Sequence, residues 1–279
     1  MSTVGHPFDG TSPGPASSGV GRRATWRTVA VPAEHGGWSL TAEPALLGLL
    51  VAFSGAGLAL AVAAMLAFVA RTPIKLVLVD RWRHRWLART TLALRIACVE
   101  VLAIVVLAGV AVLSAERSFW VPLVVAAPLI GLELWYDMRS RSRRLIPELA
   151  GSIGIGSVAA AVALAGGESN LVAAGLWCVI GARSLAAVPY VRYQILRVHE
   201  RPAVVRHSDV AQLVAVGAAA AGWVADAVPL AAVVALAALA AVNAVGARRP
   251  PPRVVVIGVQ QTVFGLVVIG VTAAAVLAG

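Results

Sequence analysis

The sequence has few charged residues for its length. Of its 279 residues only 13% are Asp, Glu, Lys or Arg, whereas 59% are hydrophobic, and the mean hydropathy is +0.86. Soluble globular domains contain about 25% charged residues. This shortage excludes an ordinary soluble domain, because most of the chain must face lipid or other apolar helices.

Cysteine is scarce as well. The two cysteines, Cys98 and Cys178, both fall inside apolar segments. A disulfide framework or a metal site needs more ligands at closer spacing. We therefore interpret both as small buried side chains and predict no metal site.

Common catalytic motifs are also missing. The chain has no glycine-rich phosphate loop, no paired-carboxylate hydrolase pattern and no nucleophile elbow. Gly151, Gly154 and Gly156 form a weak glycine pattern, which within an apolar segment indicates close helix packing rather than phosphate binding. No enzyme class follows from these motifs.

Acidic residues are fewer than basic ones. The chain has 13 Asp and Glu and 23 Lys and Arg, which gives a net charge of +10. A positive balance can indicate nucleic-acid binding, but here it is spread over five short segments without an aromatic-basic surface. We therefore predict no nucleic-acid partner. We expect contacts with membrane lipids, because inner-leaflet headgroups are anionic.

Long apolar runs fill most of the chain. Spanning a bilayer takes about 20 helical residues, and the sequence predicts an all-α, polytopic membrane protein with a transmembrane domain over 31–279. Residues 1–30, rich in Ser, Gly and Pro, are expected to form a disordered cytoplasmic tail. The nine predicted transmembrane helices are 37–54, 56–79, 90–113, 119–137, 147–165, 170–193, 208–225, 227–246 and 254–278.

Lys and Arg occur in alternate connections between these segments. The N-terminal tail and the second, fourth, sixth and eighth connections hold 18 of the 23, whereas the other connections hold only Arg117. Cationic loops of membrane proteins stay in the cytosol. We therefore predict a multi-pass protein of the cell inner (plasma) membrane, with a cytoplasmic N-terminus and an external C-terminus.

Some basic residues lie within the apolar spans, where topology does not explain them. A buried Arg costs about 2.5–3.5 kcal/mol on insertion scales, so such a residue points toward a cavity or an acid. Arg71 and Lys75 share one helix face, and Arg183 lies within a span. We predict that all three bind ligand in a cavity; for Arg183 the alternative is a pair with Glu43 or Glu133.

Three further residues are candidate ligand contacts. Asp80 follows the Arg71 region, and its alternative role is a local salt bridge to Arg83 or His84. Tyr190 and Arg192 follow Arg183, and positions 183, 190, 194 and 197 fall on one helical stripe if Pro189 leaves the helix intact.

An acid and an imidazole stand side by side where the first segment meets the membrane. Glu34 and His35 could perform acid–base chemistry or bind a headgroup or metal. The alternative is a helix cap followed by Trp38 as an interfacial anchor. We assign them as candidate catalytic residues. Glu43 lies deeper, where an acid is costly unless it is paired.

The segment Glu34-His35-Gly36-Gly37-Trp38, together with the nine-helix pattern, resembles the YwiC-like membrane proteins from about residue 30 to the C-terminus. More distantly, the chain is similar to the UbiA prenyltransferase superfamily. The start of the first segment, the Arg71 region and the run from Arg143 to Leu149 carry that similarity by their order and spacing. It implies a nine-helix bundle with its polar site on the cytoplasmic side.

This sequence departs from the UbiA pattern in its acids. UbiA enzymes hold a diphosphate through Mg²⁺ with two acidic clusters, because hard cations take oxygen ligands. The first region here keeps only Asp80, and the second has no acid between Glu168 and Glu200. The resemblance therefore implies the fold and the cavity without the catalytic carboxylates. No cofactor is predicted; Mg²⁺ would bind only in a prenyltransferase with a rearranged metal site.

Together these features predict a diverged UbiA-like protein with a cationic cavity open to the cytoplasmic face. Its lipid-soluble ligand would be an isoprenoid, quinone-like or lipid-phosphate compound. Two alternatives stay open, namely a transporter or non-enzymatic membrane assembly factor, and a prenyltransferase with a rearranged metal site. The sequence defines neither the reaction nor the oligomeric state. The predicted ligand contacts are Arg71, Lys75, Asp80, Arg183, Tyr190 and Arg192.

Overall fold

The structure is a computed structural model that describes residues 35–139 and 144–279. The predicted tail over 1–30 and Glu34 lie outside the described residues. The described residues form nine α-helices and no strand, which confirms the all-α prediction. The helices are α2 (His35–Val51), α3 (Gly55–Trp82), α4 (Ala88–Ser114), α5 (Trp120–Met138), α6 (Leu145–Ala165), α7 (Asn170–Val198), α8 (Val205–Val224), α9 (Leu230–Arg248) and α10 (Val254–Ala278).

Each predicted apolar segment contains one helix, but several helix ends differ. α3 ends at Trp82 rather than at 79, and α7 continues to Val198 rather than ending at 193. Apolarity marks the part of a helix that lies in lipid, whereas backbone hydrogen bonding continues beyond it. The polar last turns of α3 and α7 therefore belong to the helices although they lack the apolar signal.

Seven helices of the described chain are long and apolar enough to cross a membrane, namely α3, α4, α5, α6, α7, α9 and α10. α2 has 17 residues, or roughly 26 Å at 1.5 Å per residue, less than the hydrocarbon core of about 30 Å. α8 carries Arg206, His207 and Asp209 in its first turns. The chain is therefore a multi-pass membrane protein by helix length and hydropathy, with seven of the nine predicted spans reproduced.

Short connections with defined caps join the helices. Ser54 accepts a hydrogen bond from the backbone N–H of Gly57 (2.9 Å) and so caps α3. Ser169 caps α7 in the same way through Val172 (3.2 Å). Between α6 and α7 the backbone of Gly167 has a φ of 96°, which favours glycine. These caps satisfy N–H groups that a helix leaves unpaired at its start.

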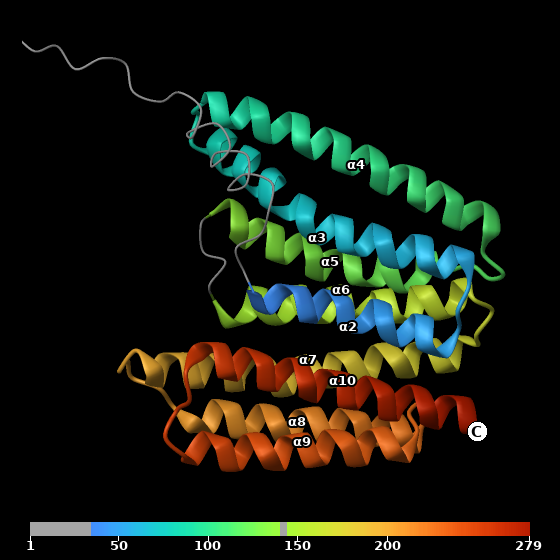
Figure 1. Ribbon diagram of the computed structural model, residues 1–279, viewed down its shortest axis with the longest axis vertical. Coiled ribbons are helices and arrows are strands. Elements are labelled where there is room, and N and C mark those ends of the chain that lie inside the picture. Colours follow the sequence, from blue (N-terminus) through green and yellow to red (C-terminus); the bar gives the residue numbers. More distant parts are fainter. Residues whose placement is uncertain (1–34, 140–143) are drawn as a thin grey trace, which may run out of the picture.

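The helices lie side by side, and successive helices run in opposite directions (Figure 1). α6 is central and packs against α2, α3, α5 and α7. α10 returns to pack against α2, α7 and α9, so the last helix closes over the first described one. α4 lies at one side of the bundle, and α8 and α9 lie at the other.

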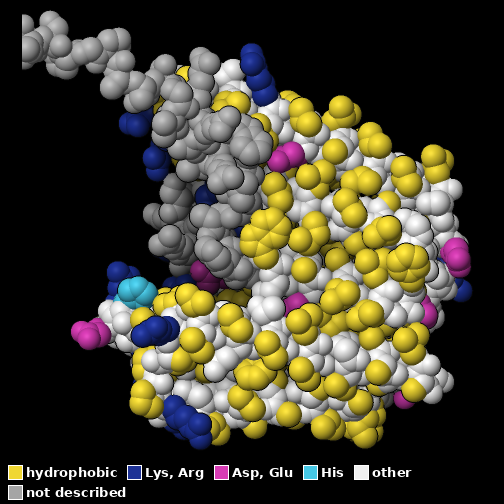
Figure 2. All heavy atoms as spheres, in the orientation of Figure 1, with side chains coloured by type: hydrophobic (Ala, Val, Ile, Leu, Met, Phe, Trp, Pro, Cys, Tyr) yellow, Lys and Arg dark blue, Asp and Glu magenta, His cyan; other side chains and the backbone are white. Residues whose placement is uncertain are grey.

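The alternate connections meet at the same end of the bundle, so the alternation of charge in the sequence becomes a one-sided surface. Most of the Lys and Arg side chains visible in Figure 2 lie at this end, where α3–α4, α5–α6, α7–α8 and α9–α10 are joined. The opposite end carries Glu116, Arg117, Glu168 and Asp226. We call the first the basic end; its location in the cytosol remains a prediction.

Small residues permit the close approach of α2 to α6. A Cβ placed on Gly48 would lie 2.7 Å from Cβ of Val162, which is buried. Lipid is as apolar as the helices, so packing rather than the hydrophobic effect holds such helices together.

We predict that Gly48→Leu destabilises the protein by about 1–3 kcal/mol, the usual cost of overpacking a core. The readout is thermal unfolding in detergent. The matched control is Gly109→Leu on α4, because an added Cβ there meets nothing within 4 Å. Equal melting temperatures for the two variants would contradict the packing of α2 on α6.

Candidate functional site

The six residues predicted to bind ligand lie in five separate places in the structure rather than around one cavity. Arg71 and Lys75 lie together, whereas the other four residues each contact a different set of partners. Most of these partners are acids or backbone carbonyls on neighbouring helices. The described residues therefore do not form the single cationic cavity that the sequence predicts.

Arg71 and Lys75 of α3 face two acids of α5. Arg71 Nη2 lies 2.8 Å from Glu133 Oε1, and Arg71 Nε lies 3.0 Å from Asp137 Oδ2. Lys75 Nζ lies 3.1 Å from Asp137 Oδ1, and the Asp137 side chain is only 1% exposed. The carboxyl group of Glu133 packs over Gly151 of α6. We call Arg71, Lys75, Glu133 and Asp137 the Arg71 group. It has two positive and two negative charges, so it is formally neutral.

Asp80 holds the turn between α3 and α4. Its buried carboxylate accepts a hydrogen bond from Thr90 Oγ1 (2.6 Å) and another from Arg89 Nη2 (3.3 Å). Arg83 and His84 were the partners expected for a local salt bridge; Arg83 contributes an electrostatic attraction to Asp80, and Arg89 forms the ion pair at 3.3 Å. His84 lies in the turn with a φ of 51°. A role of Asp80 in ligand binding stays a prediction.

Arg183 is 2% exposed and lies where four helices meet. Its Nη2 donates to the backbone carbonyl of Gln261 on α10 (2.5 Å) and lies 3.5 Å from Glu43 Oε1 on α2. The side chain of Gln261 donates to Asn243 Oδ1 on α9 (3.1 Å). The geometry thus shows the acid pairing that was the alternative for Arg183. We call Glu43, Arg183, Asn243 and Gln261 the deep polar cluster.

Several atoms of the deep polar cluster have no hydrogen-bond partner among the described residues. They are Glu43 Oε1, Arg183 Nε, Arg183 Nη1, Asn243 Nδ2 and Gln261 Oε1. Buried polar side-chain atoms are nearly always hydrogen-bonded, and one left unsatisfied costs about 1–3 kcal/mol. The three unpaired donors and two unpaired acceptors make this cluster a candidate functional site.

A second polar group lies nearer the basic end on the same face of α7. Gln194 Nε2 donates to the hydroxyl of Tyr190 and to the carbonyl of Gly246, each at 3.0 Å. Arg197 Nη1 donates to the backbone carbonyls of Ala247 (2.9 Å) and Arg249 (2.8 Å). We call Tyr190, Gln194 and Arg197 the shallow polar cluster.

The predicted stripe of α7 is confirmed, because the helix continues through Pro189. Arg183, Tyr190 and Gln194 are all buried on it. Proline is tolerated in membrane helices because neighbouring groups compensate for the missing hydrogen bond.

Arg192 forms a loose ion pair with Glu148 across α6 and α7. The distance between Nη1 and Oε2 is 3.5 Å, and each side chain is more than a third exposed. Exposed pairs of this kind contribute about 0–1 kcal/mol.

The predicted acid–base pair cannot be placed, because Glu34 and the side chain of His35 lie outside the described part of the chain. Their catalytic role stays a prediction. Within the described ranges, no group of three or more His, Cys, Asp and Glu residues could hold a metal ion.

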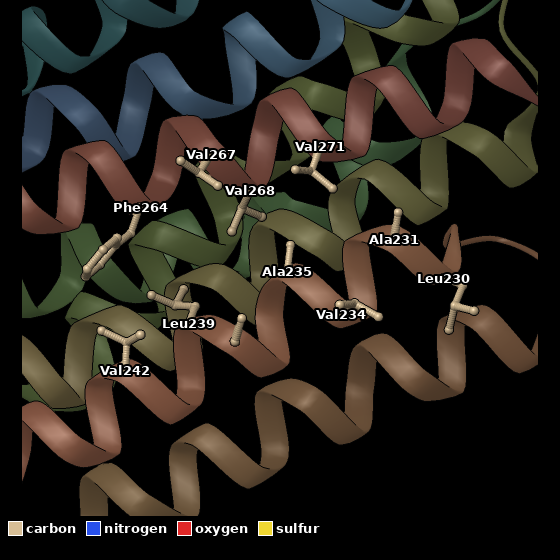
Figure 3. A pocket seen from close by; sticks show the side chains of 11 residues that line it. Leu230, Ala231, Val234, Ala235, Leu239, Val242, Phe264, Val267, Val268 and Val271 are labelled. Atoms are coloured by element: carbon tan, nitrogen blue, oxygen red, sulfur yellow. The ribbon is translucent and has the colours of Figure 1, made fainter.

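Two adjoining cavities lie between α9 and α10, and sequence reasoning did not find them. We call them together the α9–α10 groove. The first, of about 610 Å³, is apolar (Figure 3). The second, of about 480 Å³, shares Val242 and Phe264 with the first and has the polar side chains of Tyr190, Arg249 and Gln260 in its lining. The first is lined by Leu230, Ala231, Val234, Ala235, Ala238, Leu239, Val242, Phe264, Val267, Val268 and Val271; the second is lined by Tyr190, Ala241, Val242, Val245, Gly246, Arg249, Pro250, Pro252, Gln260 and Phe264.

Sequence reasoning also missed Asn243 and Gln261 as site residues. The available signal was the position of each amide within an otherwise apolar span, where polar side chains face the bundle interior. Which partner each amide would meet was not readable, since α9 and α10 contact distant parts of the chain.

Residues 31–164, just under half of the chain, match the model of a family described as YwiC-like protein. This range includes Glu43, the Arg71 group and Asp80, and it ends before α7. Neither a curated protein nor a solved structure matches the chain. The YwiC-like resemblance is therefore supported over residues 31–164, whereas none of these findings supports the UbiA resemblance.

We predict that Asp137→Ala destabilises the protein by up to about 3 kcal/mol, the low end of the range for breaking a buried ion pair. Arg71 and Lys75 would both lose a carboxylate, although their partial exposure, 25% and 31% of each side chain, reduces the cost. Thermal unfolding in detergent measures the effect.

Glu148→Ala is the matched control, because it breaks an exposed pair and should cost less than about 1 kcal/mol. If both variants unfold at the wild-type temperature, the Arg71 group does not stabilise the contact of α3 with α5.

Proposed function

We propose that this multi-pass, YwiC-like protein binds an anionic amphiphile in the α9–α10 groove. The ligand class is the isoprenoid, quinone-like or lipid-phosphate compound that the sequence predicts. The observation that carries the proposal is the continuity of the groove, because an apolar cavity shares Val242 and Phe264 with a cavity that contains three polar side chains. An apolar chain with a polar head needs such a combination.

The apolar part of the groove faces the bilayer. Leu230, Val234 and Val267 line it and are 52%, 59% and 54% exposed. A hydrocarbon chain can therefore enter sideways from the membrane without crossing a polar barrier. The volume of about 610 Å³ falls within the range of about 300–1,000 Å³ that is usual for ligand pockets.

The polar part of the groove supplies donors for an anionic head. Arg249, Gln260 and the hydroxyl of Tyr190 lie around it. Arg248 is paired with Asp209 at 3.0 Å, whereas no acid among the described residues pairs with Arg249. Guanidinium groups bind phosphate and carboxylate bidentately, so Arg249 is the principal contact that we assign.

The proposal relocates the predicted binding site. Tyr190 stays in it, whereas Arg71, Lys75, Arg183 and Arg192 contact acids elsewhere in the bundle. Among the described residues no carboxylate lines the groove, so its donors suit an anionic head rather than a Mg²⁺-bound diphosphate. We retain a diverged UbiA-like bundle as a proposal that rests on the order of the sequence segments.

The proposal also places the polar part of the groove in the cytoplasmic leaflet. Arg249 belongs to the basic end, and basic connections stay in the cytosol. The protein would then lie in the plasma membrane with its N-terminus inside and its C-terminus outside.

The test is mass spectrometry of lipids that co-purify with the protein, compared with the bulk membrane extract. We expect enrichment of an anionic amphiphile in the wild type. Val267→Trp should abolish it by filling the groove. Arg249→Ala should reduce it about tenfold or more, since a hydrogen bond to a charged group contributes about 1.5–3 kcal/mol.

Two matched controls keep this result specific. Val105→Trp adds the same bulk to the exposed face of α4, and Arg201→Ala removes an exposed arginine at the same end of the bundle. Both should keep the wild-type enrichment. Equal enrichment in all four variants, or none in the wild type, would overturn the proposal.

A further inference from the structure

We propose that the deep polar cluster is a proton-binding site, in which Glu43 exchanges a proton with the basic end of the bundle. Glu43 lies outside the α9–α10 groove, although the polar line shares Tyr190 and Gly246 with the polar part of the groove. The two proposals are tested by different residues and measurements. Three observations carry it: the weak pairing of Glu43, the orphaned polar atoms around it, and a line of polar groups that leads from it.

Glu43 is poorly compensated as an anion. Its closest charged contact, Arg183 Nη2, is 3.5 Å away, whereas the Arg71 group has contacts of 2.8–3.1 Å. The same Nη2 atom donates its short hydrogen bond to the carbonyl of Gln261 instead. A carboxylate at this depth is costly unless well paired, so binding a proton is an available way to neutralise it.

The other neighbours of Glu43 bring no charge to its carboxylate, so among the described residues Arg183 is its ion-pair partner. From α10 it meets Gly265, where even a methyl group would collide with the carboxyl group. α6 meets α2 with apolar residues such as Val162. The other charged groups on the helices packed against α2 lie elsewhere: Arg71 and Lys75 contact α5, Asp80 contacts α4, and Glu148 contacts Arg192. Arg197 donates to carbonyls at the end of α9, and Arg81 is exposed near the end of α3.

Polar side chains recur between this acid and the basic end in two clusters, which no hydrogen bond among the described residues joins. Arg183 and Arg197 are separated by 14 positions on one stripe of α7, or roughly 21 Å, with Tyr190 and Gln194 between them. On the facing helix, Asn243 lies one turn before Gly246, whose carbonyl accepts from Gln194. The two polar clusters are thus consecutive along both α7 and α9.

The proton balance is simple. A proton arriving along this line forms an O–H bond on Glu43 Oε1, the carboxyl oxygen without a hydrogen-bond partner among the described residues. Arg183 keeps its proton, because arginine does not deprotonate in proteins. The formal charge of the cluster rises from zero to +1, and the guanidinium keeps the carbonyl of Gln261 as its acceptor.

Infrared difference spectroscopy of the lipid-embedded protein tests this site. We expect the wild type to show a carboxylic-acid C=O band that changes with pH and shifts in D₂O. Glu43→Gln should lose the band. The matched control is Glu100→Gln, which changes a half-buried acid of α4 outside the polar line and should keep it.

If Glu43→Gln does not fold, the double variant Glu43→Gln with Arg183→Gln removes the pair as a unit and should lose the band in the same way. Asn243→Leu should keep the band but slow its shift in D₂O about tenfold or more. A band that persists without Glu43, or a wild type without any, overturns the site. An unchanged exchange rate in Asn243→Leu overturns the path along α9.

Discussion

Arg183 lies almost fully buried where α2, α7, α9 and α10 meet, and its charge is tolerable there because Glu43 and a carbonyl of α10 face it. A guanidinium that is only 2% exposed depends on acceptors from the surrounding helices. These acceptors come from helices distant in sequence. The charge therefore specifies which helices meet. Apolar packing between Ala-rich and Val-rich surfaces specifies this only weakly.

The same constraint operates elsewhere in the bundle. Arg71 and Lys75 connect α3 to Glu133 and Asp137 of α5, and Asp80 ties the start of α4 to the end of α3. Breaking one partner of a buried pair leaves an uncompensated charge, which costs about 3–5 kcal/mol. Most intramembrane charge is thus committed to holding the fold, and the remaining donors at the basic end can serve a ligand.

The basic end links the architecture to the proposed function. The basic connections alternate along the chain and therefore meet on one side of the bundle. The polar part of the α9–α10 groove opens at that side, and the polar stripe of α7 reaches it at Arg197. Lipid binding and proton exchange would share this end and Tyr190, while their principal residues differ: Arg249 for the first and Glu43 for the second.

The sequence predicted the parts of this structure that depend on one helix at a time. Nine helices follow from apolar length, and the stripe of 183, 190 and 194 follows from helical periodicity. The choice of partners did not follow. Helices that are apolar on all sides carry no signal for which face meets which neighbour, so the contact of Gln261 with Asn243 and the groove between α9 and α10 required the tertiary structure. For Arg183 the sequence indicated two possible partners, Glu43 and Glu133, and did not distinguish between them.

The pairing of Glu43 with Arg183 is the central claim, and a double-mutant cycle measures it most directly. Thermal unfolding in lipid would compare Glu43→Gln, Arg183→Gln and the double variant. The account predicts that Arg183→Gln, which leaves a buried carboxylate without its cation, is destabilising, and that Glu43→Gln, which mimics the protonated acid, costs less. The double variant should differ from the sum of the two by at least about 1 kcal/mol, as for contacting residues. Additive effects would contradict it, because the two charges would then stabilise the fold independently.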